Sequence, residues 1–150
     1  MNTATVKVSI AILKIKQQFL LQLRDNIPNI KYPGYWGLFG GHIEGEENPA
    51  DAMHRELLEE IGYAPPIISK FGCYESPDVI RHVFYSSLNV DINKLVLLEG
   101  WDMGLWTPED IIRGDRYSEK AQQIRPIGPV HQRILLDFLH SDFSMLKNYD

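Results

Sequence analysis

Three glutamates at helical spacing are the residues of this chain best suited to chemistry. Glu56, Glu59 and Glu60 stand at positions i, i+3 and i+4, which share one face of a helix. Like charges this close destabilise an isolated helix by roughly 0.2–0.5 kcal/mol per pair, and bound cations relieve that cost. Oxygen ligands without Cys or His select hard ions such as Mg²⁺, Mn²⁺ or Ca²⁺. A solvated acidic helix face is the alternative on charge alone.

Two further features surround these acids. A glycine pair, Gly40-Gly41, precedes them, and glycine lets the backbone bend so that a carbonyl can approach the same groove. Arg55 lies among the acids on the helix and can hold a carboxylate through a bidentate pair. Glu47 is placed to meet either Arg55 or a metal-bound water.

The helix that carries the acids has clear end signals. Asn48 supplies an N-cap, Pro49 suits the first helical position, and Gly62 supplies a stop. We therefore predict a helix from about Pro49 to Ile61. At about 100° per residue, the acids lie well to one side of an apolar stripe that is expected to pack on a sheet. This stripe consists of Ala50, Met53, Leu57 and Ile61.

The remaining chain alternates between strand and turn signals. Strands are predicted over 3–15, 18–24, 35–39, 67–74 and 79–90, with a short edge strand at 103–106. The strand at 35–39 is expected to end at the glycine pair, and a loop is expected over 25–34. Two more helices are predicted, at 108–112 and near 130–139. The fold class is therefore α+β, with a mixed sheet sandwiched between helices, in one domain over 1–150.

Composition and charge exclude several functions. The chain has 150 residues, 44% hydrophobic, and seven of its 20 acids fall between Glu44 and Glu60. Such a surface repels nucleic acid and attracts divalent cations with small phosphorylated ligands. Lysines interrupt the apolar stretch at 6–23, so we expect neither a signal peptide nor a membrane helix. The single cysteine, Cys73, forms no internal disulfide, which suits the cytoplasm; we expect it to be a buried strand residue.

The spacing of the acids resembles the Nudix box of the Nudix hydrolases. All seven strict positions match: Gly41, Glu47, Arg55, Glu56, Glu59, Glu60 and Gly62. Tyr63 departs from the pattern, since it fills an apolar slot that normally holds Ile, Leu or Val. The resemblance implies the Nudix fold and hydrolysis of a phosphoanhydride bond, with Mg²⁺ as cofactor and Mn²⁺ as a substitute.

The resemblance also implies roles for individual residues. Glu56, Glu59 and Glu60, helped by the Gly40 carbonyl, are expected to bind the catalytic metal ions. Arg55 and Glu47 are expected to orient them. Arg24, at the end of the second strand, matches a phosphate-binding arginine of some relatives; the alternative is a surface residue at a strand end.

A carboxylate must accept a proton from the attacking water, and relatives differ over which one does so. Glu56 is one candidate, and an acid on a loop after the central strands is the other. The loop candidates are Glu99, Asp102, Glu109 and Asp110, among which Glu99 is favoured. The catalytic set then contains Glu56, Glu59, Glu60, Arg55 and Glu99.

The substrate is less closely defined than the bond. The expected partner is a small nucleotide: a nucleoside diphosphate linked to another moiety, with nucleoside triphosphates and nucleotide sugars favoured. A proline near the position typical of ADP-ribose-cleaving relatives, Pro77, keeps an ADP-ribose pyrophosphatase open. A ligand sensor that does not cleave is the second function class. A homodimer also stays open, since small Nudix enzymes are often dimers.

Other residue types carry weaker signals. The five histidines lack ligand-like spacing, so surface or structural roles are expected for His42, His54, His82, His131 and His140. Aromatic residues flank the glycine pair and the later loop, and some could stack on a base. Alternation along the strands places at least half of them in the core.

Overall fold

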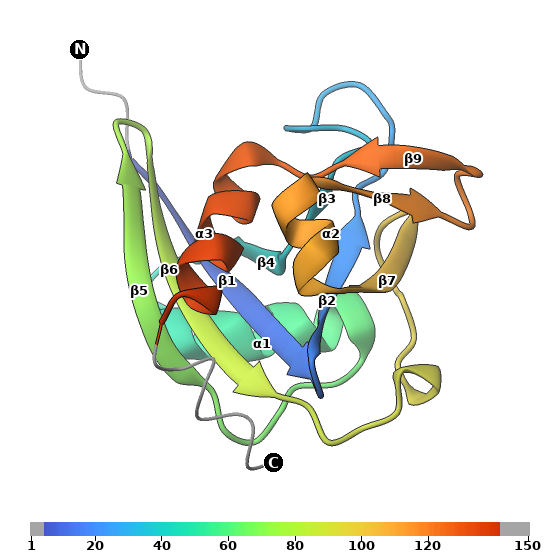
Figure 1. Ribbon diagram of the computed structural model, residues 1–150. Coiled ribbons are helices and arrows are strands. Elements are labelled where there is room, and N and C mark those ends of the chain that lie inside the picture. The colour runs from blue at the N-terminus through green and yellow to red at the C-terminus, as the bar shows by residue number, and fades with distance from the viewer. Residues whose placement is uncertain (1–4, 142–150) are drawn as a thin grey trace.

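The computed structural model describes residues 5–141. A seven-stranded mixed sheet occupies the centre of the molecule (Figure 1), and its main path runs β3-β2-β1-β6-β5. β4 pairs with β1, and β7 pairs with β2. The ladder between β1 and β6 is parallel, and the other ladders are antiparallel. The strands are β1 (Val6–Ile15), β2 (Gln18–Leu23), β3 (Trp36–Gly37), β4 (Phe39–His42), β5 (Ser69–Ser76), β6 (Val79–Ser87) and β7 (Asp102–Trp106).

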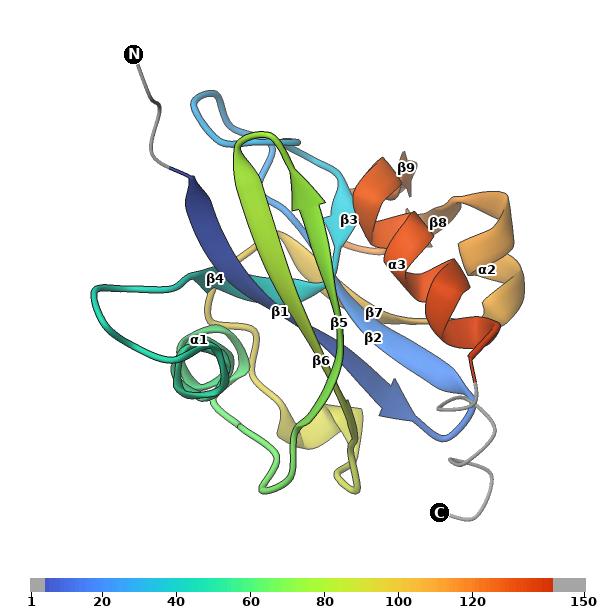
Figure 2. The same cartoon turned by 90° about the vertical axis from the view of Figure 1, so that its left-hand side faces the viewer.

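Helices cover both faces of the sheet, as the sequence predicted. Figure 2 shows α1 (Pro49–Ile61) on one side and α2 (Pro108–Arg113) with α3 (Pro129–Leu139) on the other. Met53, Leu57 and Ile61 of α1 pack into a core with Phe39 and Phe84. On the opposite face, residues of α2 and α3 close a second core that includes Phe19, Trp36, Trp106, Ile111 and Phe138. The α+β sandwich is confirmed.

The two strands of the first hairpin diverge, and this divergence creates space for the glycine pair. β1 and β2 pair only at Lys14 with Phe19 and at Ile15 with Gln18. Farther along, β3 pairs with β2 and β4 pairs with β1. The prediction of one strand over 35–39 ending at the glycines was therefore wrong. The segment changes partner at Leu38, and β4 continues through both glycines to His42.

Gly40 shows why the strand can continue. Its φ is 155°, and a Cβ there would overlap the carbonyl oxygen of Ser9 on β1. Only glycine allows this approach of two backbones. The strand therefore passes close to β1 and reaches α1 on the same face.

Helix α1 begins and ends where predicted. The Asn48 side chain accepts a hydrogen bond from the Asp51 N–H, and Gly62 ends the helix with a φ of 68°. Its buried face differs from the prediction, because Ala50 is exposed and Ala52 is fully buried. The buried face of α1 is rotated toward Glu60, whose side chain is buried between the helix and the sheet.

Other predicted elements agree within a few residues. β1 starts at Val6, while residues 3 and 4 of the predicted strand lie outside the described residues. The predicted edge strand is β7, and the loop at 25–34 contains no strand or helix. Two elements were not predicted: a short 3-10 helix, η1 (Ile92–Lys94), and a hairpin of β8 (Asp115–Ser118) and β9 (Gln123–Pro126).

Candidate active site

Arg55 is the centre of the acidic cluster. Its Nε and Nη2 donate to the two carboxylate oxygens of Glu47, at 2.7 and 3.0 Å. Its Nη1 lies 3.1 Å from Glu56 Oε1 and 3.3 Å from Glu59 Oε1. Nη2 also donates to the carbonyl oxygen of His42, at 3.0 Å. One guanidinium therefore connects three acids to the end of β4, with Glu47 in a bidentate pair.

The pairing between Arg55 and Glu47 keeps both side chains ionised. The hydrogen bond from Arg55 lowers the pKa of Glu47 to about 2, and Glu47 raises the pKa of Arg55. Glu47 Oε1 also accepts the Glu44 N–H at 3.0 Å, which ties the loop before α1 to the cluster. Arg55 and Glu47 therefore form a rigid, charged support beside Glu56 and Glu59.

Glu60 occupies a different environment from its two neighbours. Only 4% of the residue is exposed, whereas the Glu59 side chain is 49% exposed. Its Oε1 accepts the Gly40 N–H at 3.0 Å. Burial, together with the negative charges of Glu56 and Glu99, raises the pKa of Glu60 to about 8. The three acids are therefore not presented equally to a groove, in contrast to the prediction.

The glycine pair contacts two of the acids. A Cβ on Gly41 would overlap the carboxylate of Glu56, so that glycine leaves room for the acid. Burial raises the pKa of Glu56, with Arg55 opposing the rise. Gly40 contacts Glu60 through its N–H, while the metal-ligand role expected for its carbonyl stays a prediction.

Among the loop acids, Glu99 lies at the cluster. Its charge acts on both Glu56 and Glu60, because the Leu98 N–H donates to the Glu60 carbonyl at 2.8 Å and fixes the loop beside α1. Asp102 instead accepts the Ser118 hydroxyl at 2.7 Å and the Met103 N–H at 2.8 Å.

The two remaining loop candidates belong to α2. Asp110 is part of a capping box with Thr107. Glu109 is an exposed residue of the same first turn. The structure therefore brings Glu99 to the box acids and commits Asp102 and Asp110 to structural contacts.

Gln22 is a site residue that sequence reasoning missed. It is 94% buried, since only 6% is exposed, and its side chain hydrogen bonds to Glu60. The signal was present in the sequence, because Gln22 is the polar residue in the otherwise apolar run Phe19–Leu23. A buried amide in a strand requires a polar partner, and here that partner is the buried acid.

Arg24 follows β2 and lies beside a different set of residues. Its N–H donates to the Tyr35 carbonyl at 3.0 Å, and its Nε is enclosed without a hydrogen-bond partner among the described residues. Its positive charge acts on His131 of α3. The structure does not pair Arg24 with any of the box acids in residues 5–141.

The acids have the oxygen ligands that a divalent cation prefers, but their side chains must move slightly before they can bind one together. In the described part of the chain, no three acidic, His or Cys side chains converge on one point, because Arg55 Nη1 stands between Glu56 and Glu59. Glu59 is half-exposed and is held at 3.3–3.4 Å, so it can turn at small cost. Glu60 is surrounded by the negative charges of Glu56 and Glu99, and a hard ion with oxygen ligands would offset them.

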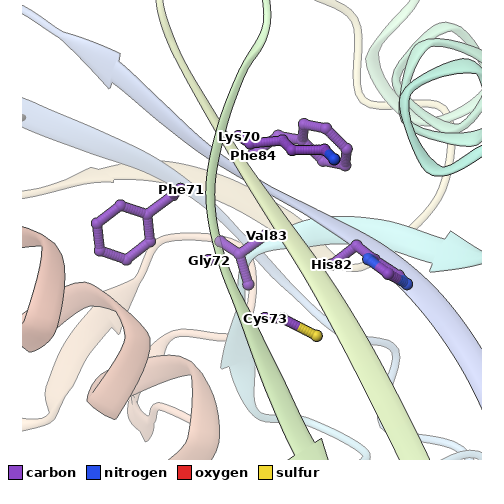
Figure 3. Close-up of a pocket in the computed structure, with 7 residues that line it drawn as sticks. All are labelled: Lys70, Phe71, Gly72, Cys73, His82, Val83 and Phe84. Atoms are coloured by element: carbon purple, nitrogen blue, oxygen red, sulfur yellow. The ribbon is translucent and has the colours of Figure 1, made fainter.

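A separate cavity of about 390 Å³ lies on β5 and β6 and contains none of the predicted site residues (Figure 3). Its lining includes Lys70, Cys73, His82 and Phe84. Cys73 is exposed there, so the prediction of a buried cysteine was wrong. β5 is an edge strand with a bulge between Lys70 and Gly72, and the side chain at 73 faces solvent beside it.

The aromatic residues divide between the cores and a loop. Trp36, Phe39 and Trp106 are fully buried in the two cores. Tyr32 and Tyr35 form an edge-to-face pair in the loop before β3, with ring centroids 5.4 Å apart.

No helix among residues 5–141 has the length and apolarity needed to cross a bilayer.

Known proteins resemble the chain in sequence. A Bacillus subtilis protein whose name proposes an 8-oxo-dGTP diphosphatase is 33% identical over 81 residues, which cover 53% of this chain and 50% of the relative. An ADP-ribose pyrophosphatase of Methanocaldococcus jannaschii is 37% identical over 67 residues, covering 45% of this chain and 38% of the relative. The chain therefore spans half or less of the length of these curated relatives.

Solved structures resemble it in fold. The NUDIX domain of Shewanella oneidensis NrtR, solved in complex with ADP ribose, has a TM-score of 0.71 at 18% identity. The similarity covers 93% of this chain and 89% of that domain. The family model for the NUDIX domain matches residues 3–125, which include the acids, Arg55 and both glycines. The chain belongs to the Nudix family.

Proposed function

We propose that this chain is a Mg²⁺-dependent pyrophosphohydrolase that cleaves a phosphoanhydride bond in a nucleoside diphosphate linked to another moiety. The observation that carries the proposal is the buried Glu60, which is surrounded by Glu56 and Glu99 and whose pKa rises to about 8. Folding alone gains nothing from three acids in one partly buried cluster. A site that binds a cation explains why they are held together.

Glu56, Glu59 and Glu60 are the proposed metal ligands. Arg55 and Glu47 act as positioning residues, because their bidentate pair fixes the guanidinium that contacts Glu56 and Glu59. Residues that hydrogen bond to metal ligands orient those ligands and affect metal affinity. The Gly40 carbonyl completes the proposed ligand set.

When bound, Mg²⁺ neutralises charge on the diphosphate and lowers the pKa of a coordinated water. The chain must then supply a base for the proton of the attacking water. Glu99 is our candidate, because it is exposed on a loop that is fixed next to the other acids. Glu56 is the alternative, since burial raises its pKa.

Nucleoside triphosphates and nucleotide sugars are the proposed substrates, with ADP-ribose as a second candidate. The relatives support nucleoside triphosphates and ADP-ribose, since one is named for 8-oxo-dGTP and another for ADP-ribose. The bound ADP ribose of the similar NrtR domain adds support for the second. A ligand sensor is the alternative function class, and the complete set of box acids favours hydrolysis over it.

We also propose a single Nudix domain over 1–150 and a cytoplasmic location, where the exposed Cys73 would stay reduced. A homodimer is a further proposal for its assembly. Sedimentation of the purified chain tests the assembly: one protomer mass at micromolar concentration would contradict the dimer.

The test of function is release of phosphate or pyrophosphate from a panel of nucleoside triphosphates, nucleotide sugars, ADP-ribose and dinucleoside polyphosphates. Each substrate is assayed with Mg²⁺, with Mn²⁺ and with EDTA. Hydrolysis of one class that stops in EDTA supports the proposal and identifies the substrate. Folded protein that binds Mg²⁺ and stabilises on adding a nucleotide, without turnover, would support the sensor instead.

A further inference from the structure

Strand β5 has an open edge. It ends the main path of the sheet, and Figure 1 shows it at the margin of the molecule. One side of β5 pairs with β6. Among residues 5–141, no strand pairs with its other side, and no backbone hydrogen bond outside the β5–β6 ladder involves residues 69–76. The edge therefore presents a row of backbone donors and acceptors with which another strand can pair.

Side-chain contacts hold β5 firmly behind this edge. The Tyr74 hydroxyl donates to Asp137 Oδ2 of α3 at 2.6 Å. The Phe71 and Phe138 rings meet edge to face, with centroids 5.3 Å apart. Both contacts tie the strand to the helix that covers one face of the sheet. A strand fixed in this way loses little further freedom when it pairs, which lowers the entropic cost of association.

The bulge in β5 arranges two opposite charges symmetrically about Cys73. His82 of β6 is the partner of Cys73. The partners of Lys70 and Glu75 are each two residues from His82, one on either side. Since strand residues two apart share a face, the three β5 side chains lie on the same face of the sheet. Without the extra residue of the bulge, Lys70 would lie on the other face, where Figure 3 shows Phe71.

A second copy of β5 would bring these charges together. In an antiparallel pair with the two Cys73 residues facing each other, Lys70 of each copy lies opposite Glu75 of the other. Opposite charges at facing positions stabilise a strand pair. Neither charge has an ion-pair partner within residues 5–141, so both are available. The other facing positions oppose no like charges: they are Tyr74 with Gly72 and Ser76 with Ser69.

The same features disfavour other strands as partners. An edge lysine and a bulge ordinarily hinder the pairing of one edge with another. A strand without an acid at the matching position would leave Lys70 without an opposite charge. A second copy supplies that acid, and the two-fold symmetry of such a pair supplies it twice.

We propose that β5 is the interface of a symmetric homodimer, in which residues 69–76 of two copies pair antiparallel about Cys73 and join the two sheets. The inference identifies the surface for the homodimer proposed above and does not depend on hydrolysis. Stable interfaces bury roughly 1,200–2,000 Å², and one pair of strands is small by that measure. We therefore expect a dissociation constant in the micromolar range.

The test is a charge swap followed by sedimentation at low ionic strength, from low to high micromolar concentration. The proteins are wild type, Lys70→Glu, Glu75→Lys and the double variant that carries both changes. Lys94→Glu is the control, because Lys94 is an exposed residue of η1 outside the sheet and makes the same charge change. Urea unfolding confirms that every variant is folded.

We expect each single variant to raise the dissociation constant of the dimer at least about tenfold, because it places like charges opposite each other at two symmetry-related positions. The double variant restores opposite charges and should return to within about threefold of wild type. Lys94→Glu should dimerise like the wild type.

Three results would overturn the proposal. A wild type that stays monomeric at every concentration would leave the edge to a strand of another protein or to solvent. A dimer that tolerates both folded single variants would place the interface elsewhere. Weakening by the single variants without recovery in the double variant would refute the pairing of Lys70 with Glu75.

Cys73 provides a second measurement that needs no change of charge. It is the single cysteine of the chain, and facing residues in antiparallel strands have Cα atoms about 4.5–5.5 Å apart, within the roughly 4.4–6.8 Å of a disulfide. Diamide takes two electrons and two protons from the two thiols, which form the disulfide while diamide becomes a hydrazine. Wild type should form the covalent dimer several times faster than Lys70→Glu at equal concentration, and the double variant should recover the rate. Equal rates in wild type and Lys70→Glu would overturn the proposal.

Assembly and turnover are measured separately, so the two proposals can fail separately. Mg²⁺-dependent turnover by a wild type that stays monomeric would refute only the dimer. A dimer that responds to the charge swap as expected, without turnover of any substrate, would refute only the hydrolase.

Discussion

Replacing Glu60 with glutamine should stabilise the metal-free protein. Glu60 is almost fully buried, and burial with nearby Glu56 and Glu99 raises its pKa from 4.5 to about 8. At about 1.36 kcal/mol per unit of pKa difference, the full cost of this site reaches about 5 kcal/mol. Removing the ionisable group would recover up to this cost, but part of the gain in stability is lost because the glutamine amide must also be buried. We therefore expect Glu60→Gln to raise the free energy of unfolding by about 2–4 kcal/mol at pH 8, or the Tm by about 5–15 °C.

The sign of the pH dependence follows from the raised pKa of Glu60. A group with a raised folded-state pKa favours folding fully below its unfolded pKa of 4.5, and this contribution disappears as pH rises through 8. The metal-free wild type should therefore lose stability between pH 4.5 and 8, and Glu60→Gln should lose less. The two proteins should be nearly equal at pH 5.

The assay is urea unfolding in EDTA from pH 5 to 9, with Glu46→Gln on the exposed loop as the control. Adding Mg²⁺ should stabilise the wild type and have little effect on Glu60→Gln. The variant should also lose Mg²⁺-dependent turnover. A variant that is less stable than wild type in EDTA at pH 8, or that keeps normal turnover, would refute the reasoning.

Three further substitutions have defined outcomes. Glu59→Gln should remove a metal ligand while α1 persists, lowering kcat at least about a hundredfold; near-normal turnover in folded protein would contradict the ligand assignment. Glu99→Gln should lower kcat by about 10²–10⁴ and leave Mg²⁺ affinity close to wild type in calorimetric titrations; near-normal kcat in folded Glu99→Gln would refute Glu99 as the base. Gly41→Ala places a methyl group on the Glu56 carboxylate and should weaken Mg²⁺ binding about 10–100-fold. Gly72→Ala is the control, because its Cβ would lie 3.7 Å from the Tyr74 ring, and it should bind Mg²⁺ normally.

The helix and its chemistry were predictable because their signals are local. Asn48, Pro49 and Gly62 define the ends of α1 through backbone preferences that do not depend on the rest of the fold. The spacing of the acids places them together on any helix. The pairing of Arg55 with Glu47 was one of the two contacts expected for Glu47, and the structure has it at 2.7 Å.

Features that depend on distant segments were harder to predict. The buried position of Glu60 requires Gly40 of β4 and Gln22 of β2, which are far apart in the sequence. The same contact rotates the buried face of α1 from Ala50 to Ala52. Hydrophobic periodicity within a helix contains no information about a hydrogen bond to a strand.

The glycine pair and Cys73 show the same limit in strands. Gly40-Gly41 reads as a strand end in local sequence, yet the divergence of β1 and β2 provides a partner that continues the strand. Cys73 lies in a strand as predicted, but β5 is an edge strand and its side chain is exposed. The local sequence predicted that these residues form strands, but it did not predict where each strand lies in the sheet.

The dependence of initial rate on Mg²⁺ concentration tests the central claim most directly. The measurement uses the best substrate of the panel with wild type, Glu59→Gln and Glu60→Gln at constant pH and nucleotide. We predict saturable activation of the wild type, no rate in EDTA, and loss of at least about a hundredfold in both variants at saturating Mg²⁺. Turnover that persists in EDTA, or that both folded variants retain, would contradict the claim that these acids bind the metal for phosphoanhydride hydrolysis.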